Sequence, residues 1–220
     1  MIVQPTLTQE IIILVLQIPI LFFSIVTHEI SHAFMAYRLG DPTAKNAGRL
    51  TYNPIKHLDL IGSLVFIGTF ILNMIHPIGV VFGWPKPVVV DFRYFRNPQK
   101  GMALVAFSGP LANFALAAIF LLIFFILDWV PVGFPIEIWL PCLFGVFINL
   151  LLGCFNLLPI PPLDGSNILA GFLPWRFTLY FYRFRNVGMI VIFLVLIRFG
   201  VNILPMLAEK FFNMFGVKFL

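Results

Sequence analysis

The sequence has few charged residues, and this scarcity decides its class. Of its 220 residues, 10% are charged and 60% are hydrophobic, and its mean hydropathy is +1.00. An ordinary water-soluble domain carries about 25% charged residues. The composition therefore excludes such a domain and predicts an integral membrane protein that is surrounded by the lipid bilayer.

Cysteines and targeting signals are scarce as well. Cys142 and Cys154 lie in one apolar segment, where they are expected to pack rather than to form a disulfide. The N-terminus lacks the basic region and cleavage site of a signal peptide, which favours a prokaryotic plasma (inner) membrane. The net charge of +5 comes from short loops without a nucleic-acid-binding motif, so no nucleic-acid partner is predicted.

Five apolar stretches are candidates for membrane insertion, because a helix needs about 20 apolar residues to span the hydrocarbon core. They are residues 10–36, 60–82, 103–127, 138–158 and 187–207. Basic residues gather in the segments 37–59, 83–102 and 159–186, and basic loops stay in the cytoplasm. Two of these segments flank 60–82, so this stretch is expected to enter and leave the membrane on one side. A plain fifth span is the alternative.

The predicted fold is an all-α polytopic membrane protein with about four spanning helices and a re-entrant, β-hairpin region at the membrane edge. Residues 48–52 and 85–92 have the pattern of short strands. Both termini are expected outside the cell, and residues 1–220 are expected to form a single domain.

A metal-binding pattern lies near the cytoplasmic end of the first apolar stretch, where residues 28–32 read His-Glu-Ile-Ser-His. On a helix, His28 and His32 project from one face and can bind one metal ion, while Glu29 points at the metal-bound water. Two solvated histidines beside a snorkelling glutamate are the alternative, but ionisable clusters inside apolar helices are costly and usually functional. The pattern predicts one catalytic Zn²⁺ per chain, with Glu29 accepting a proton from water.

A third ligand is expected because catalytic zinc normally has three protein ligands. Asp164 stands out, since it follows a run in which three prolines break the apolar stretch 138–158 near the cytoplasmic side. Asp164 could instead cap a helix that begins near Ser166. Asp59 is the rival ligand, and His57 is expected in a loop or behind the ligands.

Four motifs together resemble a known family. They are His-Glu-x-x-His at 28–32, Gly-Trp-Pro-Lys-Pro at 83–87, Ser-Gly-Pro-Leu-Ala-Asn at 108–113, and the run 156–165 that ends in Leu-Asp-Gly. In this order they resemble the site-2 protease family of intramembrane zinc metalloproteases. The resemblance implies zinc ligation by His28, His32 and Asp164, with Glu29 as the catalytic acid/base. It implies a minimal core without a PDZ or CBS domain.

The implied activity is zinc-dependent hydrolysis of peptide bonds in transmembrane protein substrates, with the active site toward the cytoplasm. Asn113 and Asn156 are candidates to donate a hydrogen bond to the developing oxyanion, or else to join helices. The segments 48–52 and 85–92 could pair with an unwound substrate, or only pack the site. A membrane zinc carrier and an inactive adaptor that binds membrane helices are the rival functions.

Overall fold

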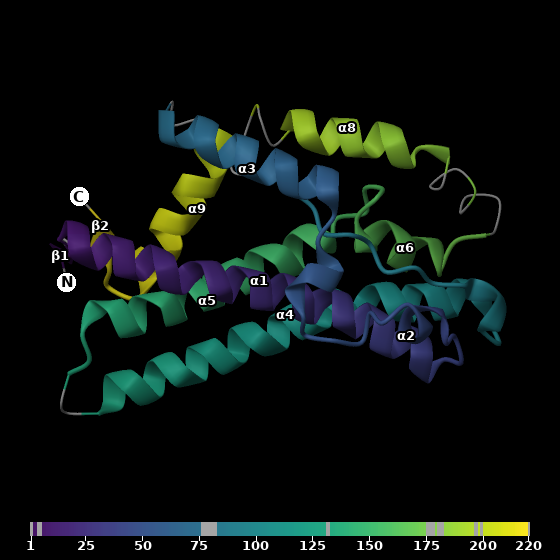
Figure 1. Cartoon of the computed structure of the whole chain (residues 1–220), viewed down its shortest axis with the longest axis horizontal. Helices are drawn as coiled ribbons and strands as arrows, with labels where there is room; N and C mark the ends of the chain where they lie inside the picture. Colours follow the sequence, from purple (N-terminus) through teal and green to yellow (C-terminus); the bar gives the residue numbers. More distant parts are fainter. Residues whose placement is uncertain are drawn as a thin grey trace.

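The structure is a computed structural model that describes residues 2–3, 6–75, 83–130, 133–174, 179, 183–195, 198 and 200–219. Helices dominate this part of the chain (Figure 1). The longest are α1 (Leu7–Arg38), α4 (Pro98–Trp129) and α5 (Ile136–Asn156). The shorter elements are β1 (Ile2–Val3), α2 (Thr43–Asn46), η1 (Pro54–His57), α3 (Leu60–Ile75), η2 (Phe92–Tyr94), α6 (Asp164–Ala170), α8 (Arg185–Val195), α9 (Val201–Met214) and β2 (Lys218–Phe219).

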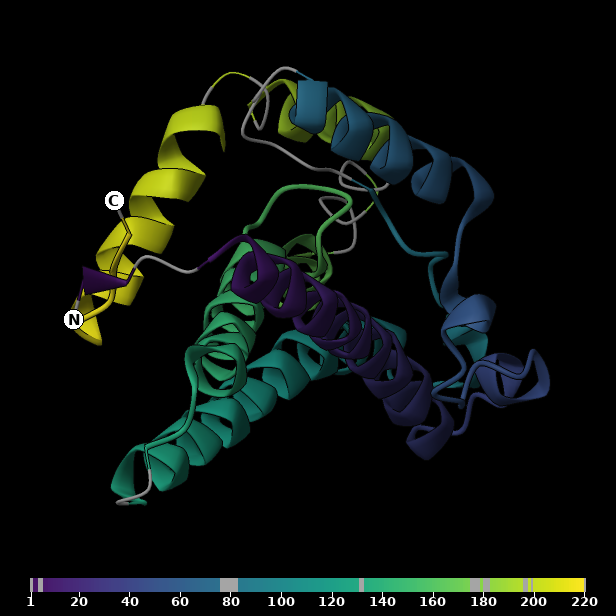
Figure 2. The same cartoon turned by 60° about the vertical axis from the view of Figure 1, so that its left-hand side comes forward.

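The helices α1, α4 and α5 pack against one another at the centre of the protein (Figures 1 and 2). Each is long and apolar enough to cross a membrane. α1 begins with a capping box in which Thr6 and Gln9 satisfy each other's backbone N–H groups. α4 begins at Pro98, with the side chain of Asn97 as its cap. These local signals fix where the two helices start.

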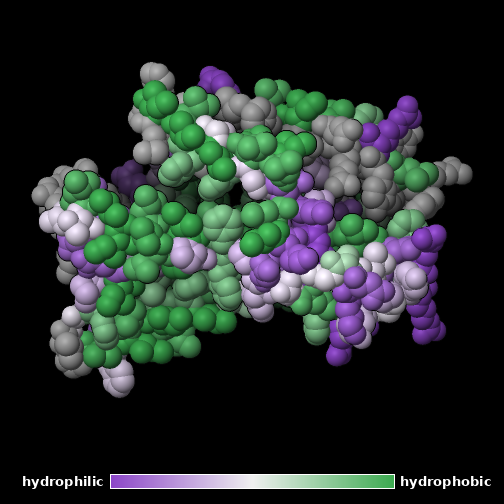
Figure 3. Space-filling view, in the orientation of Figure 1, coloured by the Kyte–Doolittle hydropathy of each residue, from purple (hydrophilic) through white to green (hydrophobic). Residues whose placement is uncertain are grey.

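The interior of this bundle contains many small residues, whereas large apolar side chains cover its outside. Buried positions on α4 include Ala103, Ala106 and Gly109, and such small residues let neighbouring helices approach closely. Large side chains such as Leu122, 60% exposed, cover the outside. In Figure 3, hydrophobic residues extend over much of the surface, while hydrophilic residues gather around α2. This distribution supports the prediction of a mostly helical membrane protein.

Three of the predicted spans coincide with these helices. The stretches 10–36, 103–127 and 138–158 correspond to α1, α4 and α5. The stretch 187–207 falls on parts of α8 and α9, which run in different directions in Figures 1 and 2, so a single fourth span is not confirmed. α3 covers the first part of 60–82, but residues 76–82 lie outside the described residues, and re-entry stays a prediction.

The predicted strands at 48–52 and 85–92 are wrong. Their described residues form no strand, and the only pairing that involves them is one antiparallel bridge between Leu58 and Pro85. The two strands that the structure does contain, β1 and β2, have two residues each and pair in parallel, which joins the two ends of the chain.

The side chain of Arg49 connects the loop segments in place of hydrogen bonds between strands. Its buried guanidinium donates hydrogen bonds to the carbonyl oxygens of Lys56, Lys86 and Pro87. Proline has no N–H to donate to a neighbouring strand, so the prolines of this region prevent a regular ladder. A buried arginine therefore holds these loops together instead of a hairpin.

Candidate metal centre

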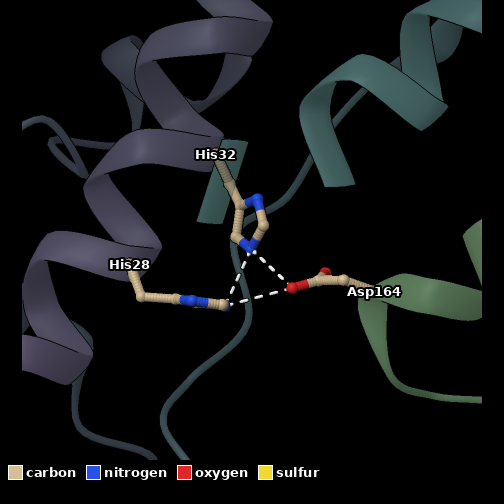
Figure 4. A group of neighbouring side chains, drawn as sticks. All are labelled: His28, His32 and Asp164. Carbon is tan, nitrogen blue, oxygen red and sulfur yellow. Dashed lines mark hydrogen bonds and ion pairs between the residues drawn. The ribbon is translucent and has the colours of Figure 1, made fainter. Parts of the chain in front are cut away.

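Three side chains from two distant parts of the sequence converge within the helix bundle (Figure 4). Nε2 of His28 lies 3.1 Å from Oδ2 of Asp164, and Nε2 of His32 lies 3.3 Å from the same oxygen. The two Nε2 atoms are 3.1 Å apart. Within the described part of the chain, this is the one group of three or more such side chains whose ligand atoms lie close enough to share a metal ion.

The opposite nitrogen of each imidazole contacts an oxygen. Nδ1 of His28 lies 2.6 Å from Oδ1 of Asn113, and Nδ1 of His32 lies 2.7 Å from the backbone oxygen of Val105. A carbonyl oxygen can only accept a hydrogen bond, so both contacts favour the tautomer that carries its hydrogen on Nδ1. Each Nε2 then presents a lone pair to the point where the three side chains meet. Partners of this kind orient metal-binding histidines in proteins.

These atoms fit a bound zinc ion. Ligand atoms about 2.0–2.1 Å from a tetrahedral zinc are separated from one another by roughly 3.3 Å, and the three measured separations are 3.1, 3.1 and 3.3 Å. Oδ2 of Asp164 is buried and receives no hydrogen bond from the described residues. Three lone pairs at this spacing require a positive charge between them, which a divalent cation would supply.

The charge of Asp164 suits such a cation. Burial raises the pKa of its carboxyl, but the attraction of His32 and the contacts with both imidazoles outweigh this effect and lower the pKa to about 2. Asp164 therefore carries the negative charge that a metal ligand needs. Protons and a metal ion compete for the Nε2 lone pairs of such histidines.

Local sequence places each ligand. His28 and His32 are four residues apart on α1 and so share one face of the helix. Asp164 is the first residue of α6 and does not cap it, because the cap position is Leu163 and no side chain caps this helix. Its neighbour Gly165 lies so close to the end of α5 that a Cβ there would be 2.2 Å from the carbonyl oxygen of Leu157.

Glu29 lies between the two histidines in sequence and is 7% exposed. His28 and His32 are buried as well, so all three belong to the buried side of α1. A carboxylate at this depth in an apolar helix is costly and marks a functional position.

Asn113 forms hydrogen bonds between helices, which is the alternative role that the sequence left open for it. Its Oδ1 faces His28, and its Nδ2 donates to Oδ1 of Asn149 at 2.9 Å and to the backbone oxygen of Ser24 at 3.4 Å. Its hydrogen-bonding groups are thus engaged inside the protein, which favours the role in joining helices over a hydrogen bond to the oxyanion. The Nδ2 of Asn156 donates to the oxygen of Leu152 at 3.0 Å, and its role stays a prediction.

The rival ligand and the nearby histidine are engaged elsewhere. Oδ1 of Asp59 accepts a hydrogen bond from the backbone N–H of Gly62 at 2.8 Å, at the start of α3. His57 is 2% exposed, and its Nε2 lies 2.9 Å from the backbone oxygen of Thr51. Neither belongs to the group of three side chains.

Sequence reasoning missed two residues behind the site, Ser24 and Asn149. Both are 0% exposed and hydrogen-bonded to each other at 2.8 Å. The available signal was a lone polar residue inside an apolar helix, which is expensive in a membrane unless it has a partner.

Comparison with known proteins finds a family model and several similar proteins. A model of peptidase family M50 matches residues 134–199. The chain is 38% identical over 180 residues to "Putative zinc metalloprotease YwhC" of Bacillus subtilis, which covers 80% of this chain and 77% of that protein. It is 34% identical over 142 residues to "Putative zinc metalloprotease MJ0611" of Methanocaldococcus jannaschii, covering 64% and 62%.

A third relative is "Putative zinc metalloprotease Rip2" of Mycobacterium tuberculosis, 33% identical over 146 residues, covering 66% of this chain and 52% of that protein. No solved structure matches the chain. The relative with 38% identity is matched over most of its length, and its name agrees with a family that uses zinc to cleave peptide bonds. The chain belongs to peptidase family M50, the site-2 protease family.

Proposed function

We propose that this protein is a zinc-dependent endopeptidase that hydrolyses peptide bonds of membrane-embedded protein substrates. The observation that carries the proposal is the convergence of His28, His32 and Asp164 beside Glu29 inside a bundle of apolar helices. Peptide hydrolysis inside the membrane requires an activated water molecule and a base. The three ligands would hold the ion that activates the water, and Glu29 can act as the base.

The residues divide the chemistry between them. His28, His32 and Asp164 would hold one zinc ion, with a position left for water. A zinc ion bound there lowers the pKa of its water to about 7 and polarises a carbonyl group. Glu29 accepts the proton of the attacking water and returns it to the leaving amine. Asn156 is the remaining candidate for a hydrogen bond to the carbonyl oxygen as negative charge develops there.

The position of the site along α1 supports cleavage near the cytoplasmic surface. His32 lies six residues before Arg38, the last residue of the helix, which is about 9 Å at 1.5 Å per residue. The same end of α1 leads into basic loops that carry Lys45, Arg49 and Lys56, and basic loops face the cytoplasm. We therefore propose that the active site faces the cytoplasm. A prokaryotic plasma membrane as the location and a transmembrane protein as the substrate belong to the same proposal.

A membrane zinc carrier is supported less well. A carrier needs ligands that pass the ion along a path, whereas the described residues hold one group of three ligands. An inactive adaptor would not need a buried carboxylate at Glu29.

The test is a Glu29→Gln variant compared with His28→Ala. The glutamine keeps the size of the side chain but cannot accept a proton, so we expect Glu29→Gln to bind zinc and to cleave a co-expressed transmembrane substrate at least 100-fold more slowly. His28→Ala is expected to lose both zinc and cleavage. Cleavage at the normal rate by Glu29→Gln would contradict the enzymatic assignment.

A further inference from the structure

A chain of hydrogen bonds crosses all three long helices behind the candidate ligands. It starts at Nδ1 of His28 on α1, which lies 2.6 Å from Oδ1 of Asn113 on α4. Nδ2 of Asn113 donates to Oδ1 of Asn149 on α5 at 2.9 Å, and Nδ2 of Asn149 donates to Oγ of Ser24 at 2.8 Å, which returns the chain to α1. Asn113, Asn149 and Ser24 are each 0% exposed.

We propose that Asn149 and Ser24 act through Asn113 to hold His28 in the tautomer and orientation that direct its Nε2 at the metal. Asn149 is a positioning residue, because its hydrogen bonds go to Asn113, Ser24 and Gly145 and reach His28 only through Asn113. The inference rests on the metal site of the proposed function and adds residues that set how well that site binds zinc.

Backbone carbonyls fix the direction of every bond in this chain. The amide of Asn149 also donates to the carbonyl oxygen of Gly145 at 2.8 Å, and the hydroxyl of Ser24 lies 2.7 Å from the carbonyl oxygen of Ile20. These carbonyls can only accept hydrogen bonds. The NH₂ group of Asn149 must therefore face Gly145 and Ser24, and its Oδ1 must face Asn113.

The same logic then orients Asn113. Its NH₂ group faces two acceptors, Oδ1 of Asn149 and the backbone oxygen of Ser24. Its Oδ1 is thereby turned toward His28, where it can only accept, so the hydrogen of His28 lies on Nδ1. A flipped Asn113 amide would present NH₂ to Nδ1 and favour the tautomer of His28 with its hydrogen on Nε2. A protonated Nε2 has no lone pair with which to bind the metal.

The two histidines differ in how they are fixed. Nδ1 of His32 meets a backbone oxygen, that of Val105 at 2.7 Å, which cannot flip. Nδ1 of His28 meets the side-chain amide of Asn113, which can flip and exchange its oxygen for its NH₂ group. His28 therefore needs the partners on α5 and α1, whereas His32 does not.

Zinc affinity of the detergent-purified protein, measured by competition with a chromophoric chelator, tests the inference. Asn113→Ala should weaken zinc binding about 10- to 100-fold, the range found when a partner behind a metal-binding histidine is removed. Asn149→Ala should weaken it about 10-fold. The double variant should bind no more weakly than Asn113→Ala, because Asn149 acts only through Asn113.

Asn113→Asp separates positioning from general packing. A carboxylate presents an acceptor to His28 in either orientation, so it cannot impose the wrong tautomer. In the Asn113→Asp background, Asn149→Ala should leave zinc affinity within twofold. An equal effect of Asn149→Ala in both backgrounds would overturn the proposal, as would unchanged zinc affinity in the single Asn149→Ala variant.

Leu143→Ala provides the matched control on the same helix, since Leu143 is 0% exposed and belongs to a separate hydrophobic cluster. It should lower thermal stability and leave zinc affinity and the visible spectrum of the cobalt-substituted protein unchanged. A blue shift or loss of that spectrum in Asn149→Ala but not in Leu143→Ala supports positioning. Normal zinc affinity in His28→Ala would contradict the metal site itself. Normal zinc affinity in Asn149→Ala together with weakened affinity in His28→Ala would leave the metal site in place and contradict only the positioning role.

Discussion

Gly109 on α4 lies directly against the imidazole of His32 on α1. A Cβ atom at this glycine would be 2.5 Å from Nε2 of His32 and 2.6 Å from Cε1 of His28. Real side chains essentially never approach so closely, because steric repulsion rises steeply at such distances. The absence of a side chain at one position of α4 therefore makes room for both histidines.

Substituting Gly109 by alanine should disrupt the metal centre. The added methyl group must displace the imidazoles from their present positions, so we expect zinc content to fall by at least half and cleavage to fall with it. Gly68→Ala is the matched control, because a Cβ at Gly68 of α3 meets nothing within 4 Å. Metal analysis and activity of the two variants, measured side by side, check this expectation. Normal zinc content in Gly109→Ala would show that the histidines do not lie where the structure places them.

Removing the guanidinium of Arg49 should loosen the loops without emptying the site. Arg49→Ala loses hydrogen bonds to three carbonyl oxygens, and a hydrogen bond from a charged group contributes about 1.5–3 kcal/mol. We expect faster hydrogen exchange in residues 54–58 and 84–88, with zinc content unchanged. Arg96→Ala, at an exposed arginine, should change neither. Protection of these loops as strong as in the wild type would contradict the role of Arg49.

Zinc affinity should rise with pH. The pKa of Asp164 is lowered to about 2, so its carboxyl is already ionised above about pH 4 and does not limit binding. The imidazoles must lose protons before their Nε2 atoms can bind zinc, and up to two protons are released for each ion. Affinity should therefore fall as the pH is lowered, because a protonated imidazole cannot bind zinc. Chelator competition at a series of pH values is the measurement, and an affinity independent of pH would contradict ligation by both histidines.

The sequence was sufficient to predict which three side chains would lie together, and local spacing explains the histidine pair. His28 and His32 share a helix face whenever that segment is helical, and long apolar stretches leave little alternative to a helix. Asp164 was predicted from its place after a run of prolines, and the structure puts it at the start of α6. The pairing of the two histidines requires no knowledge of how distant segments pack, whereas the approach of Asp164 to them does.

The remaining features depend on how distant segments pack and could not be predicted from local patterns. The alternating pattern of 85–92 is typical of a strand, but the partner of these residues is the side chain of Arg49. For Asn113, the sequence leaves two roles open, a hydrogen bond to the oxyanion or a contact that joins helices. Its actual partners, His28 and Asn149, are set by how α1, α4 and α5 are rotated against one another. Spacing along one helix does not encode that rotation.

The most direct measurement is the zinc content of the purified protein beside an Asp164→Ala variant. The structure brings Oδ2 of Asp164 within 3.3 Å of both Nε2 atoms across more than 130 residues of sequence. The wild type should contain one zinc ion per chain, and Asp164→Ala should contain less than half as much after dialysis against a weak chelator. A full equivalent of zinc in Asp164→Ala would contradict the three-ligand site.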